Sequence, residues 1–303
     1  MTPNFLKLAI LLILLSGQGR GDAPTPGIPA IPAQSQTCPG LGSTQGVTVY
    51  DGKVYIYGDS TTGVLQEFTF DSGTSTQANA SPQANSSPHL QPTGRTVRLT
   101  RDGQNLLNHP TGLALHEGLP CFLGNTVTAT KQGKIFRLDL PKALAEGSLD
   151  HAVLNETLDD LAVQGARPEY VRYHDRELLA SSDYGAGPNF VRLFDPAKLA
   201  TASRTSEPGV LVRKIPCGPF VQLLHWVDET STLVVVENVT AGRGWRLTLV
   251  SNLDAPDYRT GLDVKTLDFP SHKNELEGYA HVNHDWAIFV TSSPTNNITF
   301  ASR

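Results

Sequence analysis

Short apolar runs separated by polar turns recur along the chain from residue 45 onward. In the first of them, Val47–Tyr50 and Val54–Tyr57 flank an Asp51-Gly52 pair. An Asp-Gly pair supplies the positive φ angles that a tight turn needs, so this segment predicts a β-hairpin. A third strand is predicted at Gly63–Phe70. Four later segments repeat the order of strand, turn and strand, at residues 113–123, 170–180, 221–236 and 279–290.

The third strands of these segments fix the spacing of the repeat. Arg-Leu pairs at 137–138, 192–193 and 246–247 stand 55 and 54 residues apart. Two of the pairs precede Pro141–Ala145 and Pro196–Ala200, where proline begins a short helical turn. Fourth strands are predicted at 96–99, 210–215 and 264–267, with a weaker one near 152–154. A repeat of about 55 residues with about four strands is typical of a β-propeller.

The sequence favours an all-β propeller with five blades over residues 45–303, with six blades as the alternative. The fifth blade ends after its third strand, so its outer strand is either missing or contributed by the Pro- and Gly-rich arm at 22–44. A sixth blade would need the arm together with residues 71–108, which have little strand character. The stretch 71–93 is rich in Ser, Thr, Gln and Asn and predicts a low-complexity insertion. A two-domain β-sandwich protein is the other architecture that fits.

The N-terminus predicts export. Lys7 precedes the apolar run Leu8–Leu15, and small residues continue to Gly21, which is the order of a secretory signal peptide over residues 1–21. The run is much shorter than the roughly 20 residues that cross a bilayer. We therefore expect a secreted monomer, periplasmic in a Gram-negative host, without a membrane span. An uncleaved membrane anchor is the alternative. Its three cysteines allow at most one disulfide bond.

The amino-acid composition agrees with many short strands, and the net charge disfavours one class of binding partner. Charged residues make up 17% of the chain, against about a quarter in an average protein, and there are 27 Gly and 21 Pro. This balance disfavours coiled coils and helical solenoids. The net charge of −5 provides no basic surface, so we do not expect a nucleic-acid partner.

The candidate site follows from strand direction. Strands alternate in direction within a blade, so the loop entering the first strand and the loop between the second and third emerge on one face. The entry loops carry Gln45, His109, Arg167, Glu169, Gln222 and Glu277, and the second set carries Asp59, Asn125, Asp183 and Glu237. We expect these polar residues to converge on the central channel and bind a small polar molecule or a glycan. Three tryptophans and three histidines suggest a sugar platform, but at strand positions they are assigned to packing: Trp226, Trp245, Trp286, His225, His281 and His284.

Like charges that converge near a low-dielectric channel need a neutralising partner. Ca²⁺ or another divalent cation takes carboxylate and amide oxygens of the kind present here. An Arg167–Glu169 ion pair would do the same without any site. Polar turn residues also occur on propellers for purely structural reasons, because Asp and Asn side chains hydrogen-bond their own backbone.

Two segments resemble a known family. His109-Pro110-Thr111-Gly112-Leu113-Ala114 is similar to the blade openings of NHL-type and gluconolactonase-like propellers, and Lys131–Arg137 is similar to their third-strand entry. Such propellers usually have six blades and hold a metal ion through Glu, Asn and Asp side chains. The resemblance implies Glu169 or Glu277, together with Asn125 and Asp183, as metal ligands.

Two functions of different classes follow. In the first, a metal ion polarises an ester or lactone carbonyl and His109 is the general base of a hydrolase. In this hypothesis Gln45, Asp59, Arg167, Gln222 and Glu237 contact the ligand. In the second, the propeller is a non-catalytic scaffold that binds a protein or glycan through its loops.

Overall fold

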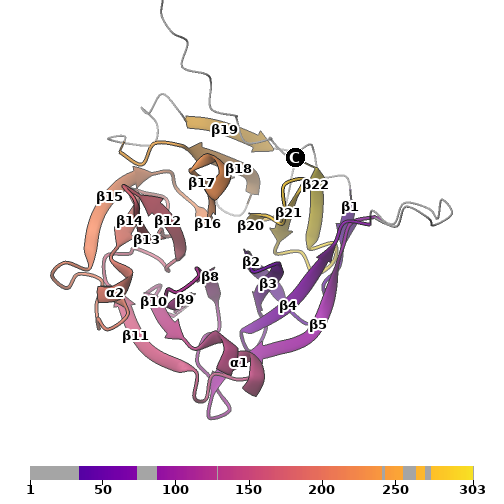
Figure 1. The fold of residues 1–303 in the computed structure, drawn as a ribbon, viewed down its shortest axis with the longest axis horizontal. Coiled ribbons are helices and arrows are strands. Elements are labelled where there is room, and N and C mark those ends of the chain that lie inside the picture. The colour runs from indigo at the N-terminus through magenta and orange to yellow at the C-terminus, as the bar shows by residue number, and fades with distance from the viewer. Residues whose placement is uncertain are drawn as a thin grey trace, which may run out of the picture.

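The computed structural model describes residues 34–73, 87–127, 129–240, 243–254, 264–269 and 274–302. Five antiparallel sheets of four strands surround a common axis (Figure 1), which confirms the five-bladed propeller and excludes the six-bladed and β-sandwich alternatives. The predicted signal peptide, residues 1–21, lies outside the described residues. Among those residues, no helix is long and apolar enough to cross a membrane.

Each blade begins with the strand nearest the axis and continues outward. The first blade consists of β2 (Ser43–Tyr50), β3 (Lys53–Asp59), β4 (Val64–Asp71) and β5 (His89–Arg98), and the second of β8 (Pro110–Ala114), β9 (Cys121–Thr126), β10 (Gly133–Leu138) and β11 (Val153–Asp159). The third consists of β12 (Glu169–Tyr173), β13 (Arg176–Ser181), β14 (Asn189–Phe194) and β15 (Leu211–Cys217), and the fourth of β16 (Val221–Val227), β17 (Thr232–Thr240), β18 (Arg243–Val250) and β19 (Val264–Phe269). The fifth consists of β20 (Leu276–His281), β21 (Trp286–Thr291), β22 (Ile298–Ser302) and β1 (Gln34–Gln36). A small hairpin of β6 (Thr100–Arg101) and β7 (Gln104–Asn105) follows the first blade.

Local chemistry explains the turns and the two short helices. Asp51 and Gly52 have φ angles of 49° and 67°, as the Asp-Gly hairpin signal predicts. Helix α1 (Leu140–Glu146) begins where the Asp139 carboxylate accepts the backbone N–H of Lys142. The Asp195 carboxylate caps α2 (Pro196–Leu199) in the same way. These are the two helical turns that the repeat predicts.

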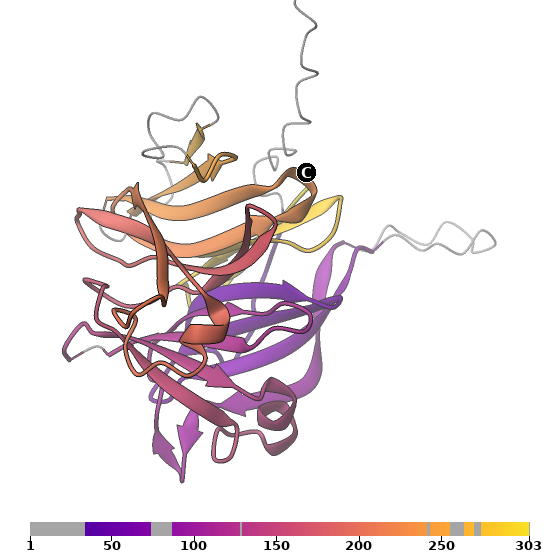
Figure 2. The same ribbon diagram turned by 60° about the vertical axis from the view of Figure 1, so that its left-hand side comes forward.

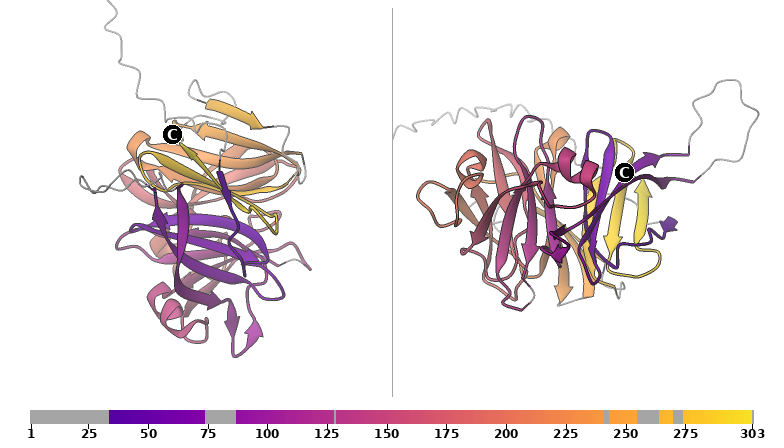
Figure 3. Two further views of the ribbon diagram at one scale, coloured as in Figure 1. Left: turned by 90° about the vertical axis from the view of Figure 1, so that its right-hand side faces the viewer. Right: turned by 90° about the horizontal axis from the view of Figure 1, so that it is seen from below.

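The N-terminal arm closes the ring. β1 pairs with β22, so the arm supplies the outer strand of the fifth blade, which was one of the two predicted possibilities. The Gln36 side chain also donates to Leu90 O (2.9 Å) and accepts from Leu90 N (2.8 Å) on β5. β1, the outer strand of the last blade, is thereby joined to β5, the outer strand of the first blade, and the two lie beside each other in Figure 1 and in the side views of Figure 3.

The expected insertion at 71–93 is shorter in the structure, because β4 reaches Asp71 and β5 begins at His89. Residues 74–86 of that stretch lie outside the described residues. Leu90, its one large aliphatic residue, is fully buried in the core. The sheets stack face to face around the axis (Figure 2), and the core fills the spaces between neighbouring blades.

Candidate functional site

The central channel has two ends. At the entry end the innermost strands β2, β8, β12, β16 and β20 begin; at the hairpin end they finish and turn into the second strands. Sequence analysis placed every candidate residue at the entry end. The structure divides these residues between the entry end, the middle of the channel, the spaces between blades and a cavity toward the hairpin end.

At the entry end, His109 and Asp59 are in contact. The Nδ1 atom of His109 lies 2.6 Å from Asp59 Oδ2, and both side chains are about one quarter exposed, at 25% and 23%. The backbone N–H of His109 donates to Asn125 Oδ1 at 3.0 Å. Asp59 therefore fixes the imidazole ring, while the amide of Asn125 fixes the backbone that carries it.

Arg167 is buried in the channel but does not pair with Glu169. Its Nε donates to Gln222 O at 3.1 Å, one terminal nitrogen lies 3.3 Å from Gln222 Oε1, and the other donates to Gln164 O at 3.2 Å. Among the described residues, Arg167 and Glu169 form no ion pair, so a channel closed by that pair is not observed. Burial lowers the pKa of Arg167 to about 10, and Glu277 is the first of the charges that oppose this shift.

Glu277 belongs to a pair of carboxyl groups. Burial raises the pKa of Glu277 well above its usual range, the neighbouring Glu275 raises it further, and Arg167 acts in the opposite direction. Glu275 accepts hydrogen bonds from Gln222 Nε2 at 2.8 Å and Asn238 Nδ2 at 3.4 Å. A proton on Glu277 is therefore stabilised by hydrogen bonding to Glu275.

Tyr57 brings a hydroxyl group into the same channel from the second strand of its blade. Its ring crosses β2 at Gly46, where a Cβ atom would lie only 2.3 Å from the hydroxyl oxygen, so a larger residue would block it. Burial and the Glu169 carboxylate, in that order, raise the pKa of Tyr57. The hydroxyl is fully buried and has no hydrogen-bond partner of good geometry among the described residues.

Other predicted site residues are bound by neighbouring groups of the protein. Asp183 accepts from Arg192 at 3.2 Å and from Val163 N at 2.7 Å, and Arg192 also pairs with Asp159 at 3.4 Å, all within the buried space between the second and third blades. Glu237 is buried and accepts from Thr248 Oγ1 at 2.5 Å. Gln45 donates to Ser43 Oγ, two residues away on the same strand, at 3.2 Å.

The four residues predicted to hold a metal ion thus have four different environments. Asn125 binds the backbone of His109, Asp183 pairs with Arg192, Glu277 adjoins Glu275, and Glu169 faces a cavity. No group of three or more His, Cys, Asp and Glu side chains in the described part of the chain is arranged to hold a metal ion.

The cavity that Glu169 faces has a volume of about 280 Å³. Its lining comes from the last residues of the innermost strands and the turns that follow them, so it lies toward the hairpin end. The lining residues are Thr48, Val49, Tyr50, Leu115, His116, Glu117, Glu169, Tyr170, His225, Trp226 and Asp228. Glu169 stands at the beginning of β12, so its carboxylate forms the inner end of the cavity.

Glu169 is deep in the molecule yet retains a solvent-accessible surface, because that surface faces the cavity. Burial raises its pKa well above the usual range, and the Asp228 carboxylate adds to this shift. The backbone N–H of Tyr170 donates to Glu169 Oε1 at 2.9 Å and favours the ionised form. Within the described residues Glu169 has no ion-pair partner, in contrast to Asp183.

The other polar groups of the cavity are held in place by their neighbours. Trp226 Nε1 donates to Asp228 Oδ1 at 2.9 Å, and Tyr170 donates its hydroxyl to Pro120 O at 2.6 Å. His225 Nε2 accepts the backbone N–H of His281 at 3.1 Å, which requires a lone pair on that nitrogen and favours the neutral ring. The assignment of Trp226 and His225 to packing was therefore incomplete, because both also line the cavity. Trp245 does pack in the core, stacked on Phe289 at 5.8 Å.

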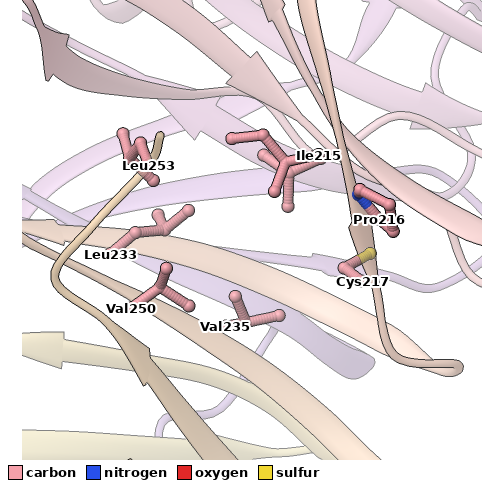
Figure 4. A pocket seen from close by; sticks show the side chains of 8 residues that line it. Ile215, Pro216, Cys217, Leu233, Val235, Val250 and Leu253 are labelled. Carbon is pink, nitrogen blue, oxygen red and sulfur yellow. The ribbon is translucent and has the colours of Figure 1, made fainter. Parts of the chain in front are cut away.

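A second pocket, shown in Figure 4, is too small to be a site. Its volume of about 10 Å³ is lined by apolar side chains between the third and fourth blades, among them Ile215, Leu233 and Leu253. A dry space of this size belongs to the core packing. Cys217 borders it, and burial raises the pKa of this thiol to about 12. All three cysteines are free, so the single disulfide bond that the sequence allowed is not formed.

The fold and the channel define a five-bladed β-propeller. No protein-family model matches the chain, and no curated protein matches its sequence. Among solved structures, hydrazine synthase from Kuenenia stuttgartiensis is similar, with 11% sequence identity and a TM-score of 0.41. The similarity covers 83% of this chain and 56% of that chain, so this chain spans a little over half the length of the synthase chain. This likeness carries no argument about activity.

Sequence reasoning missed Tyr57 and most of the cavity lining. The signal for Tyr57 was the pairing of a glycine on the first strand with an aromatic residue on the second, which lets the aromatic side chain pass the inner strand. The cavity residues carried a weaker signal: His225 and Trp226 stand near the end of an inner strand, and Asp228 follows Trp226 by two residues.

Proposed function

We propose that the protein is an exported propeller that binds a small polar ligand in the axial cavity toward the hairpin end. The observation that carries this proposal is Glu169, a carboxyl group deep inside the molecule that faces a cavity of about 280 Å³. A buried carboxyl group without an ion-pair partner is costly in an empty site. A ligand that hydrogen-bonds or neutralises it offsets that cost.

The size and lining of the cavity agree with a small ligand. Ligand sites generally have volumes from about 300 Å³ upward and combine apolar walls with a few oriented polar groups. Here Trp226, Tyr170 and Val49 supply apolar surface, while Glu169 and Asp228 supply acceptors. A folded protein domain or a long glycan chain would not fit in this volume, so the proposed partner is a small molecule.

Filling the cavity tests this proposal. Leu115 lines the cavity, and Leu115→Trp places a large side chain inside it. The matched control is Val212→Trp on the outer strand β15, where the side chain is 40% exposed. The measurement is the melting temperature with millimolar glucose, succinate or choline, which represent neutral, anionic and cationic polar ligands. We expect at least one of them to raise the melting temperature of the wild type and of Val212→Trp, but not of Leu115→Trp.

The proposal fails if none of the three compounds raises the melting temperature of the wild type. It also fails if the rise persists in Leu115→Trp, because the ligand would then bind elsewhere.

A second candidate function is favoured by the contact between His109 and Asp59. A carboxylate that orients an imidazole is an arrangement found in general-base catalysis, so an ester or lactone hydrolase at the entry end is the alternative. Asn125 and Asp183 would have to leave their present partners to bind a divalent cation for such a reaction. Hydrolysis of p-nitrophenyl acetate or γ-butyrolactone that requires calcium and disappears in His109→Asn would favour this alternative. Calcium binding with unchanged hydrolysis in His109→Asn would count against it.

A further inference from the structure

We infer that the ligand of the axial cavity is a small organic cation, whose ammonium group lies between the Glu169 and Asp228 carboxylates. The same group contacts the aromatic wall of the cavity, formed by Tyr50, Tyr170 and Trp226. This inference rests on the proposed ligand-binding function of the cavity and specifies the chemistry of the ligand.

The first support is the charge of the lining. Glu117, Glu169 and Asp228 line the cavity, and no lysine or arginine is among its lining residues. Arg172, which lies on β12 with Glu169 and Tyr170, donates to Glu177 at 2.8 Å and is therefore already paired. His116 lies 3.7 Å from the same Glu177 carboxylate, which offsets its charge when the ring is protonated. The cavity is therefore electronegative, which disfavours an anionic ligand.

The second support is the interaction between two carboxylates across the cavity. Asp228 disfavours the ionised form of Glu169, as its contribution to the pKa of Glu169 shows. Asp228 is itself fixed by the Trp226 indole N–H, so the two negative groups cannot move apart freely. A cation placed between them turns this repulsion into two attractions.

The third support is the aromatic wall. Tyr50, Tyr170 and Trp226 line the cavity. The Tyr170 hydroxyl and the Trp226 N–H are already engaged with Pro120 and Asp228, so what these two side chains offer a ligand is mainly their ring surfaces. Aromatic faces beside carboxylates bind alkylammonium groups, since the negative face of each ring attracts the positive charge. A bare metal ion would not use such surfaces, and a cavity of about 280 Å³ is large for one.

The fourth support is independent of the acidic residues. The Tyr57 hydroxyl is fully buried, lacks a hydrogen-bond partner of good geometry, and lies in the channel close enough to Glu169 for that carboxylate to be the first charge acting on it. This hydroxyl group can donate a hydrogen bond to the Glu169 carboxylate once a cation keeps that carboxylate ionised.

The inference predicts a coupling between ligand binding and protons. The ligand-free protein keeps a proton on Glu169 to higher pH than an exposed glutamate does, because burial raises the pKa of that group well above its usual range. An ammonium ligand requires the ionised form, so binding releases up to one proton, and affinity falls as pH drops below the pKa of Glu169. The other titratable groups that face Glu169 or line its cavity are Tyr50, Tyr57, His116, Glu117, His225 and Asp228.

The test compares choline with its uncharged isostere 3,3-dimethyl-1-butanol by titration calorimetry of the wild-type protein. We expect choline to bind at least about tenfold more tightly than the alcohol, which corresponds to the loss of one cation–π or charge interaction. Titration in buffers of different ionisation enthalpy counts the released proton. Affinity for choline should fall with decreasing pH, while affinity for the alcohol should not change.

Glu169→Gln should weaken choline binding on the order of 30-fold, because it removes one partner of a desolvated charge pair, and should abolish proton release. The matched control is Glu156→Gln, whose exposed carboxylate pairs with Lys134 on the outside of the second blade. This control should bind choline as the wild type does. If Glu169→Gln does not fold, wild-type proton release and the choline-to-alcohol ratio still decide the question.

The outcomes separate the two proposals. The cationic ligand is wrong, but the proposed function stands, if glucose or the alcohol binds, Leu115→Trp abolishes that binding, and choline binds no more tightly. Calcium displacing choline, or binding without it, overturns the organic cation in favour of an inorganic one. If no compound binds, both proposals fail.

Discussion

Two glutamates in one channel show how different neighbours give the same residue type different roles. The pKa values of Glu169 and Glu277 are both raised, and burial is the largest cause for each. Glu275 hydrogen-bonds the protonated form of Glu277, while the Arg167 guanidinium favours the ionised form, so both forms have a partner within the protein. Glu169 faces a cavity, accepts the backbone N–H of Tyr170 and has no ion-pair partner among the described residues, which is why we propose a ligand there.

The buried proton of Glu277 makes stability depend on pH. Above about pH 4.3 the unfolded chain loses a proton that the folded protein keeps, because the pKa of Glu277 is raised in the folded state. The folded state then binds more protons, so Glu277 lowers the free energy of unfolding progressively as pH rises toward the folded pKa. Glu277→Gln keeps a similar shape and cannot ionise.

We therefore expect the free energy of unfolding of Glu277→Gln, relative to the wild type, to increase with pH by at most about 1.4 kcal/mol per pH unit, the limit for one proton. Urea unfolding between roughly pH 5 and pH 8 measures this difference, which grows until pH passes the pKa of Glu277 in the folded protein. Glu156→Gln on the exposed surface should show no such trend. A difference that is constant with pH would mean that Glu277 is already ionised in the folded protein.

At the scale of elements, ring closure depends on a strand of three residues. β1 (Gln34–Gln36) pairs with β22, and Gln36 forms two side-chain hydrogen bonds with the backbone of Leu90 on β5. The side chain thereby acts as one more pairing residue between the fifth and first blades. Asn297 adds a second connection, because it accepts from Cys38 N at 2.8 Å and donates to Cys38 O at 3.1 Å.

Gln36→Ala should lower the free energy of unfolding by about 1 to 2 kcal/mol, because it leaves one backbone donor and one acceptor of Leu90 without their partner. Gln34→Ala on the same strand is the control and should change stability much less. Urea unfolding monitored by circular dichroism measures both. Equal losses in the two variants would show that β1 contributes through its backbone pairing alone.

The elements themselves were largely predictable, and the reason is local. Asp51-Gly52 and the alternation of apolar and polar residues report on turns and strands within a few residues, so blade count, hairpins and the two helical turns were all predicted. The fourth strand of the second blade was predicted only weakly, since Val153–Asp159 carries Asn155, Glu156 and Thr157 on an outer edge. The outer strand of the fifth blade could not be decided, because its pairing partner β22 lies more than 250 residues away in the sequence.

At the scale of the whole molecule, the sequence indicated which residues surround the channel but not which end of the channel, or which space between blades, each side chain faces. The repeat places Glu169, Arg167 and Asp59 around one channel, and the contact between Asp59 and His109 agrees with their expected common face. The repeat does not say whether a side chain points along the axis or between blades. Asp183 and Glu237 turn into the spaces between blades, where Arg192 and Thr248 bind them, and Glu169 turns toward the hairpin end.

The predicted export of the molecule has to preserve the same ring closure. A signal peptidase cut after Gly21, as the sequence predicts, leaves residues 22–33 ahead of β1 and preserves every contact of Gln34–Cys38. A cut beyond residue 33 would remove part of the strand that closes the fifth blade, so processing and folding restrict the new N-terminus to a narrow range. We expect the intact mass of protein recovered from the periplasm of a Gram-negative host to correspond to an N-terminus at Asp22.

Leu12→Lys interrupts the apolar run and should keep the full-length protein in the cytosol, whereas Gln34→Ala should be processed like the wild type. Full-length wild-type protein in the cytosol would overturn export, and an N-terminus beyond residue 33 on a folded protein would overturn the role of β1 in closing the ring.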